Sequence, residues 1–220
     1  MASPEKVALF DAFAAVAKAL ANGRRAELID VLAQGERSVD GLAAEVGQSL
    51  ANTSQHLQVL ARAGLVQARR DGNRVLYRLA GDAVGELWAA VRGVASQHLA
   101  GLDRLAADYL GDRRGMEELS RVELARRLGD GLVVWDVRPA AEFEAGHVPG
   151  AVSVPPGEVR RRLRSISKEA EVVAYCRGPY CVFADDAVRE LRSKGRRAAR
   201  LEDGFPEWRR AGLPVAVGPE

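Results

Sequence analysis

Hydrophobic residues recur every three to four positions through the first third of the chain, which is the spacing of helices that share one core. Residues 7–20 carry Leu9, Phe13, Val16 and Leu20 on a single stripe. Further helical patterns, each closed by a glycine, cover residues 24–32, 39–46 and 50–63. Residues 65–79 then alternate between polar and apolar, and an Asp-Gly turn signal in their middle predicts a hairpin.

The next pattern spaces apolar residues alternately by four and three positions, and it predicts one long helix over residues 82–110. The residues on this seam are Val84, Trp88, Val91, Ala95, His98, Leu102, Leu105 and Tyr109. Two copies packed along residues 7–20 and 82–110 would form a homodimer. We interpret His98 as a packed seam residue rather than a ligand.

Short apolar runs alternate with helical patterns in the second half of the chain. Strands are expected at residues 132–135, 152–154, 172–175 and 197–201, and helices at 122–128, around 159–166 and from 184. Such alternation predicts a mainly parallel sheet with functional residues at the carboxyl ends of its strands. The polar stretch at 111–119 then separates two domains, a mainly-α one at 1–110 and an α/β one at 120–220.

The helical patterns before and after Gly47, with a hairpin behind them, describe a winged helix-turn-helix. The stretch from Ser49 to Val66 and the hairpin from Arg69 to Leu79 resemble the recognition helix and wing of ArsR-type repressors, over roughly residues 5–110. The resemblance implies a homodimer that binds double-stranded operator DNA and leaves it when an inducer binds. Base and phosphate contacts are expected from Ser49, Ala51, Asn52, Ser54, Gln55 and His56 on the helix, and from Arg69, Arg70, Asn73 and Arg74 on the wing.

Charge supports this interpretation only locally. The whole chain of 220 residues has a net charge of +2, but five arginines and one acid lie between Arg62 and Arg78. This patch would attract an acidic partner such as DNA, whereas the alternative is an ordinary solvated face. ArsR-type proteins often bind metal through cysteines or clustered histidines. The first 110 residues hold no cysteine and only two histidines, so neither a metal nor a cofactor is expected.

The sequence predicts a cytoplasmic protein. No run approaches the ~18 apolar residues of a membrane span, and the first residues do not form a secretion signal. The two cysteines, Cys176 and Cys181, are too close and too few for a disulfide framework, which indicates a reducing compartment and a role in thiol chemistry.

Cys176 is expected at the end of a buried strand, before a glycine-containing loop and the start of a helix. Backbone N–H groups and the positive end of a helix dipole favour a thiolate in such a place. The alternative is an inert buried cysteine in a strand–loop–helix connection.

Four separated motifs in the second half resemble a rhodanese domain, over roughly residues 117–217. They are Asp136-Val-Arg138, Glu142-Phe-Glu-Ala-Gly-His147, Cys176-Arg-Gly-Pro-Tyr-Cys181 and Gly204-Phe-Pro-Glu-Trp208. The resemblance implies that Cys176 is the nucleophile, that it takes sulfane sulfur as a persulfide and that it passes the sulfur to a thiol. The six-residue loop is the length associated with sulfur substrates rather than phosphate or arsenate.

The loop suggests a mechanism and leaves two questions open. The N–H groups of Arg177, Gly178, Tyr180, Cys181 and Val182 are expected to cradle the persulfide, and the side chain of Arg177 could attract an anionic donor. Asp136, Arg138 and Glu142 form either a catalytic support network or a structural ion pair. His147 is expected to fix a turn. Cys181 could bond to Cys176 or point away from it.

Together these features predict a repressor whose rhodanese domain senses or handles sulfane sulfur through Cys176, with a small sulfur donor or thiol acceptor as its second partner. One alternative is a sulfurtransferase whose DNA-binding domain is regulated independently. Another is a metalloid-responsive repressor that uses both cysteines, which the lack of a third cysteine disfavours. The sequence leaves open whether catalytic turnover occurs.

Overall fold

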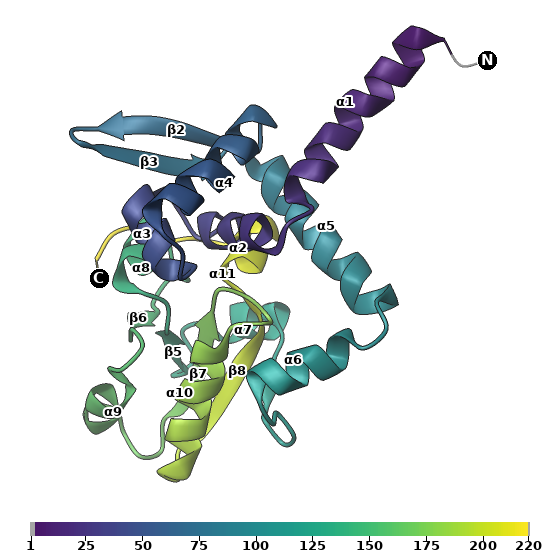
Figure 1. Ribbon diagram of the computed structural model, residues 1–220. Coiled ribbons are helices and arrows are strands. Elements are labelled where there is room, and N and C mark those ends of the chain that lie inside the picture. Colours follow the sequence, from purple (N-terminus) through teal and green to yellow (C-terminus); the bar gives the residue numbers. More distant parts are fainter. Residues whose placement is uncertain (1–2, 220) are drawn as a thin grey trace. The chain divides into compact units, whose positions relative to one another are not determined.

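The computed structural model describes residues 3–219, which divide into two compact units, one ending at Val94 and the other beginning at Ala95 (Figure 1). Each unit has its own hydrophobic core. None of the described helices is long and apolar enough to cross a membrane.

The first unit is a winged helix-turn-helix, as the sequence predicts. Its elements are α1 (Pro4–Leu20), α2 (Gly23–Leu32), β1 (Arg37–Ser38), α3 (Val39–Glu45), α4 (Leu50–Arg62), β2 (Val66–Asp71), β3 (Arg74–Leu79) and the larger part of α5 (Asp82–His98). Strand β1 was not predicted from the sequence; it pairs antiparallel with β3 and gives a sheet of order β1-β3-β2.

Local side-chain chemistry sets the ends of these elements. The Ser38 and Ser49 hydroxyls accept hydrogen bonds from the Gly41 and Asn52 N–H groups at the start of α3 and α4. Gly72 has a φ of 56°, which suits glycine and lets the hairpin turn between β2 and β3. The unit is held together by a core that includes Leu28, Ile29, Leu42, Leu57 and Leu60.

The prediction of one helix over residues 82–110 is wrong. The chain forms α5, breaks, and resumes as α6 (Leu102–Leu110) after Gly101, whose φ of 84° cannot continue a right-handed helix. The first two residues of the predicted dimer seam make contacts within the first unit instead. Val84 is buried in the first core, and the Trp88 indole donates to Asp30 at 2.6 Å.

The second unit is an α/β domain, and its sheet confirms the predicted parallel order. Besides α6 its elements are β4 (Glu118–Leu119), α7 (Arg121–Arg127), β5 (Val133–Asp136), α8 (Ala140–Ala145), β6 (Val152–Ser153), α9 (Val159–Arg162), the 3-10 helix η1 (Leu163–Ser165), β7 (Glu171–Cys176), α10 (Val182–Ser193), β8 (Arg197–Gly204) and α11 (Phe205–Arg210). The strand order is β4-β8-β7-β5-β6, and every neighbouring pair is parallel.

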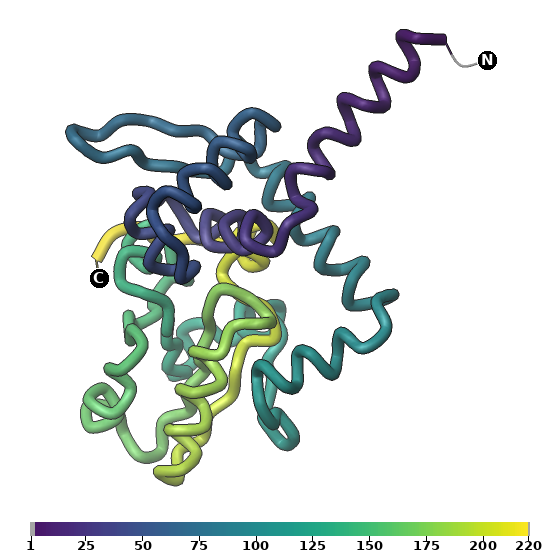
Figure 2. Tube along the Cα trace, viewed as in Figure 1, coloured from purple at the N-terminus to yellow at the C-terminus, as the bar shows by residue number. Residues whose placement is uncertain are grey.

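The sheet has a core on each face, because side chains alternate along its strands. On β7, Val173 and Tyr175 join the cluster that includes Phe205 and Trp208, while Ala174 and Cys176 join the cluster that includes Leu191 of α10. The trace in Figure 2 follows β7 through a short loop into α10. Cys176 therefore lies at the carboxyl end of a central strand, beneath the helix that its own loop begins.

Candidate functional site

Helix α4 supplies the candidate recognition surface. Thr53, Leu57 and Leu60 are buried, so the helix turns its other face outward. Of the residues predicted to contact DNA, Ser49, Ala51, Asn52 and Gln55 are exposed, whereas Ser54 and His56 are partly buried. The Ser49 hydroxyl caps the helix through its contact with Asn52.

The hairpin brings the predicted wing residues together at its tip. Arg70, Asn73 and Arg74 are exposed, but the Arg69 guanidinium is bound to the Glu36 carboxylate, with Nε 2.8 and 3.0 Å from the two oxygens. This hydrogen bond raises the pKa of Arg69. Glu36 thus engages one of the wing arginines expected to contact DNA.

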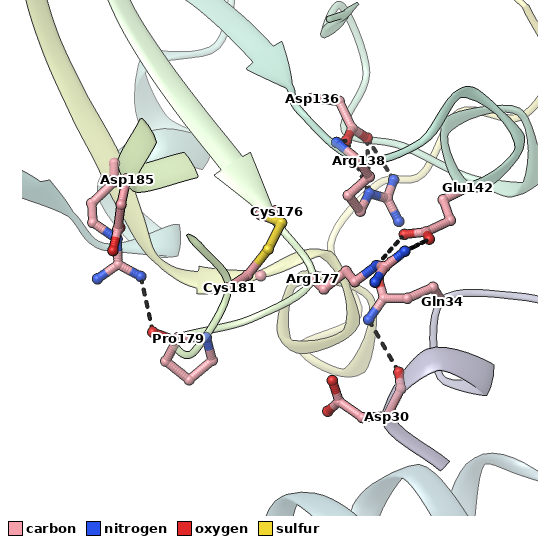
Figure 3. Close-up of a disulfide and its surroundings, with 12 residues drawn as sticks. Asp30, Gln34, Asp136, Arg138, Glu142, Cys176, Arg177, Pro179, Cys181 and Asp185 are labelled. Carbon is pink, nitrogen blue, oxygen red and sulfur yellow. Dashed lines mark hydrogen bonds and ion pairs between the residues drawn. A yellow bond between two sulfur atoms is a disulfide. The ribbon is translucent and has the colours of Figure 1, made fainter. Parts of the chain in front are cut away.

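The sequence places Cys176 correctly at a strand end and leaves Cys181 open, and the structure joins the two in a disulfide (Figure 3). Their Cα atoms lie 6.2 Å apart. Cys176 is 1% exposed, and Cys181 is the N-cap residue of α10. The bond therefore joins the end of β7 to the start of α10 and closes the loop into a ring. The two cysteines do not belong to a metal cluster, because residues 3–219 contain no group of three or more potential ligands.

Gly204 at the end of β8 supports this loop from below. A Cβ atom added there would overlap the backbone of Arg177 and Gly178, so the two chains approach as closely as they do only because residue 204 is glycine. Within the loop the Cys181 N–H donates to the Gly178 carbonyl at 3.2 Å. Of the expected cradle donors, Cys181 thus donates inside the loop, while Tyr180 within the loop and Val182 directly after it are partly buried.

The Arg177 side chain turns toward α8 and binds Glu142. Its Nε lies 3.0 and 3.1 Å from the two carboxylate oxygens, and the two side chains are 11% and 1% exposed. In Figure 3 the two groups face each other beside the disulfide. Glu142 thus pairs with Arg177, whereas the prediction from the sequence grouped it with Asp136 and Arg138.

Asp136 and Arg138 form the second ion pair, and both side chains are fully buried. Arg138 Nε lies 2.9 Å from Asp136 Oδ1, and Arg138 also donates to the Gly146 carbonyl at 2.7 Å. The Tyr175 hydroxyl donates to Asp136 Oδ2 at 2.6 Å and accepts from the Val148 N–H at 3.0 Å. This role of Tyr175 was not predicted from the sequence, although the alternation along β7 places its side chain on the sheet face opposite Cys176.

Burial and charge set the protonation of this network. Burial raises the pKa of Tyr175 well above its ordinary value, and the neighbouring Asp136 carboxylate adds to the effect. Burial is the largest single influence on Arg138 and disfavours its charged form, but the hydrogen bond to Asp136 and the attraction of the nearby acidic groups together outweigh it and leave the pKa of Arg138 raised. The network is therefore a fixed support with a neutral phenol.

His147 fixes the turn after α8, as expected. Its Nδ1 lies 2.9 Å from the Phe143 carbonyl, and its ring stacks on that of Phe143 at 3.7 Å. Its backbone pairs with Ala216. Phe205 and Trp208, the two aromatic residues of the fourth rhodanese-like motif, are buried.

Comparison with known proteins assigns a family to each half. The model described as "Bacterial regulatory protein, arsR family" matches residues 22–68, and the model described as "Rhodanese-like domain" matches residues 120–211. The HTH-type transcriptional regulator Rv0324 of Mycobacterium tuberculosis is 50% identical over 217 residues, which are 98% of this chain and 95% of that protein.

Two further relatives match one half each. A sulfurtransferase of Allochromatium vinosum is 32% identical over 107 residues, 48% of this chain and 98% of its own length. A solved fragment from Mycobacterium bovis, described as a homodimeric winged helix-turn-helix DNA-binding domain of a possible ArsR-family regulator, is 50% identical. It covers 45% of this chain and 92% of the fragment, with a TM-score of 0.42.

Proposed function

Because the chain belongs to the ArsR-type transcriptional regulators that carry a rhodanese-like domain, we propose that it is a sulfur-responsive repressor. It would bind operator DNA as a homodimer, with Cys176 making that binding depend on reactive sulfur. We assign residues 1–110 to DNA binding and dimerisation, 111–119 to the linker and 120–220 to sulfur chemistry. The observation that carries the proposal is the pairing of Cys176 with Cys181 in the rhodanese loop.

The first unit has the surfaces that this function needs. The exposed face of α4 would enter the major groove, and Arg70 and Arg74 on the hairpin would bind phosphates. Dimerisation would use the apolar side chains that α1 leaves exposed, namely Val7, Leu9, Phe10 and Phe13. A dimer presents two copies of α4, so the operator would be a palindrome with half-sites about one helical turn apart.

The sulfur chemistry would follow two displacement steps. The Cys176 thiolate attacks the outer sulfur of a hydropersulfide R–S–SH, which forms Cys176–S–SH and releases R–S⁻, protonated by water to R–SH. The Cys181 thiolate then attacks Cys176 Sγ, so that the Cys176–Cys181 bond forms and HS⁻ leaves. The two cysteines lose two electrons, and the transferred sulfur atom gains them as sulfide.

The charges around the loop favour a donor of this kind. The nearly buried Glu142 occupies the Arg177 guanidinium, the cation that would otherwise attract an anion. Thiosulfate carries two negative charges on the group that reacts, whereas the persulfide group of a hydropersulfide carries at most one. We therefore expect hydropersulfides to react faster than thiosulfate at Cys176.

The competing function is a sulfurtransferase, which the similarity of the second half to such an enzyme favours. A transferase passes the sulfur of Cys176–S–SH to an external thiol and regenerates the reduced enzyme. Here Cys181 competes for the same step from within the loop. The wild-type protein should therefore end as a disulfide after one turnover, while Cys181→Ser should retain the persulfide and pass it to added thiols.

The test measures DNA affinity and intact mass on the same samples. Operator fragments are selected from genomic DNA with the reduced protein, and their affinity is measured before and after treatment with a hydropersulfide. Wild-type protein should lose about 2 Da as the disulfide forms, and Cys181→Ser should gain about 32 Da, the mass of one sulfur atom. Affinity should change at least about tenfold in the wild type and not in Cys176→Ser.

Two results would count against the proposal. Unchanged affinity alongside the expected mass changes would leave an enzyme attached to a DNA-binding domain with another inducer. Continuous transfer of sulfur by the wild type to an added thiol, detected as the persulfide of that thiol and unaltered by operator DNA, would point to the sulfurtransferase.

A further inference from the structure

Residues 110–115, which lead into the rhodanese-like domain, are held by α10, the helix that follows the cysteine loop. Arg189 on α10 donates to the carbonyls of Leu110 and Asp112 at 2.7 and 3.3 Å. One turn later, Arg192 donates to the Gly115 carbonyl at 2.5 Å. Residues 110–115 therefore lie along α10, and a shift of this helix would move or break its hydrogen bonds to the linker.

Arg113 extends this contact to the loop itself. Its Nε donates to Asp185 Oδ2 at 2.7 Å, and its Nη2 donates to the Pro179 carbonyl at 3.0 Å. Pro179 is one of the six residues in the disulfide ring, and Asp185 lies in the first turn of α10. One linker side chain thus holds both the ring and the helix that leaves it.

The site that receives Arg113 is buried and preformed. The Asp185 side chain is fully buried, and Arg200 Nε lies 3.2 Å from its second oxygen. Arg200 also donates to the Pro179 carbonyl at 3.4 Å, so this carbonyl is shared by two guanidinium groups. Arg113 itself is 23% exposed. Since Arg200 keeps Asp185 paired, removal of Arg113 does not leave the buried carboxylate without a cation.

Reduction of the disulfide would act on this arrangement through Cys181. Cys176 is fixed at the end of a central strand with a core around it, whereas Cys181 begins a helix. Two thiol sulfurs cannot remain at bonding distance, so Cys181 Sγ moves away from Cys176, and Cys181 lies where the ring meets the first turn of α10. Those segments carry the Pro179 carbonyl and Asp185, the two groups that Arg113 holds at once.

We propose that Arg113 is a positioning residue that couples the bonded state of Cys176 and Cys181 to the linker between the DNA-binding and rhodanese regions. With the disulfide closed, Arg113 binds both partners and the linker is held on α10. With the thiols reduced, Arg113 keeps only one of its two partners and the linker is released. Only the consequence at DNA rests on the proposed function, because the coupling itself is a property of the second unit.

The same coupling must act in the other direction. If closing the disulfide stabilises the held linker, holding the linker stabilises the disulfide by an equal factor. Removal of Arg113 should therefore make the disulfide easier to reduce. This effect separates a positioning role from a merely structural one, because a side chain that only holds the fold would not move the thiol–disulfide equilibrium.

Hydrogen exchange on the full chain tests the first direction without any DNA. Amides of residues 111–116 should exchange about tenfold faster in reduced than in oxidised wild-type protein. Arg113→Gln should exchange at the fast rate in both states. Arg114→Gln is the matched control, because Arg114 is 92% exposed and its ion-pair partner is the nearby Asp112; it should behave like the wild type.

Redox titration against glutathione tests the second direction. The equilibrium constant for disulfide formation should fall about tenfold in Arg113→Gln, which is about 30 mV for a two-electron couple. Arg114→Gln should leave it unchanged, and Arg113→Lys should restore part of the effect, since one ammonium can bind one of the two partners.

Equal linker exchange in the two wild-type states, measured with no variant at all, would overturn the coupling. So would an Arg113→Gln protein with an unchanged redox equilibrium. Operator affinity separates this inference from the proposed function. If the linker and the disulfide are coupled but DNA affinity does not change, the role of Arg113 stands and the proposal of a sulfur-responsive repressor is rejected. If the redox state still changes DNA affinity in Arg113→Gln, only the role of Arg113 is rejected.

Discussion

At the scale of residues, the second unit places a fully buried ion pair at the end of β5, the strand that pairs with the cysteine-bearing strand β7. Asp136 accepts hydrogen bonds from Arg138 and from the Tyr175 hydroxyl, and neither charged side chain reaches solvent. Such a pair does not by itself imply high stability, because the free energy lost when the two charges leave water offsets much of their mutual attraction. Its effect here is to fix the strand ends from which Cys176 extends.

Tyr175→Phe tests this network, and its effect should depend on pH. Removal of the hydroxyl breaks its hydrogen bonds with Asp136 and the Val148 N–H, so the free energy of unfolding should fall by about 1–3 kcal/mol at pH 7–9. The folded pKa of Tyr175 is raised, so its contribution is fully present below the unfolded pKa of about 10 and is lost as the pH rises through the folded value.

The gap between wild type and variant should therefore narrow above pH 10, by up to about 1.4 kcal/mol for each pH unit. Urea denaturation at pH 8, 10 and 11 measures it. A gap of constant size across this range would mean that the phenol is not protected in the folded protein.

Much of the site could be predicted from the sequence at this scale, and the failures have clear physical causes. A β-branched run before a glycine-containing loop was enough to place Cys176 at a strand end. The partner of Arg177 could not be predicted, because Glu142 lies on a helix far away in the chain. The same holds for Arg113 and Asp185, which pair across 72 positions. The spacing of hydrophobic and polar residues indicates local structure only, whereas these contacts join residues that the tertiary fold brings together.

At the scale of elements, the hairpin separates arginines of two kinds. Glu36 holds Arg69, whereas Arg70 and Arg74 near the turn form no ion pair with the residues that the structure describes. The three residues look equivalent in the sequence, and only the pairing distinguishes them.

We expect the double change Arg70→Ala and Arg74→Ala to reduce the salt dependence of operator binding. For each phosphate that a protomer no longer neutralises, the slope of log K against log salt should fall by about one. Arg69→Ala should change the slope by less than half as much, because its guanidinium is engaged within the protein. Fluorescence anisotropy over a series of salt concentrations measures both, and equal slopes for the two variants would contradict the assignment.

Element ends were predictable where side-chain chemistry sets them, as at the Ser38 and Ser49 caps. The break between α5 and α6 was not predictable, because the heptad-like spacing of apolar residues continues across it and across Gly101, which has a positive φ. A single glycine is tolerated within a helix, so the sequence does not reveal that this one adopts a positive φ. The two-residue strands β1 and β4 are too short to show a period.

At the scale of the whole molecule, the chain leaves large apolar side chains uncovered on its first helix. Only Ala19 of the 17 residues of α1 is buried, while Phe10 and Phe13 are 60% and 61% exposed. Burying two such rings between protomers would contribute about 3–6 kcal/mol to dimerisation.

Phe10→Ser combined with Phe13→Ser should convert a dimer into a monomer at micromolar concentration, as measured by sedimentation. Operator affinity should fall with it, because a monomer can contact a single half-site. Val122→Ser, at a residue of the second unit that is 72% exposed, is the control and should sediment like the wild type. Unchanged sedimentation of the double variant would exclude α1 from the interface.

The two cysteines of this chain are neighbours in one ring, and nothing else in the 220 residues carries a thiol. A maleimide can therefore label two groups in the reduced protein and none in the disulfide form. A persulfide on Cys176 is recognised by mass, because it adds one sulfur atom to the protein. Labelling with a heavy maleimide under denaturing conditions would separate the reduced form from the disulfide form as discrete bands on a gel. A cell extract would then report the fraction of molecules in each state, without a purified protein or a known operator.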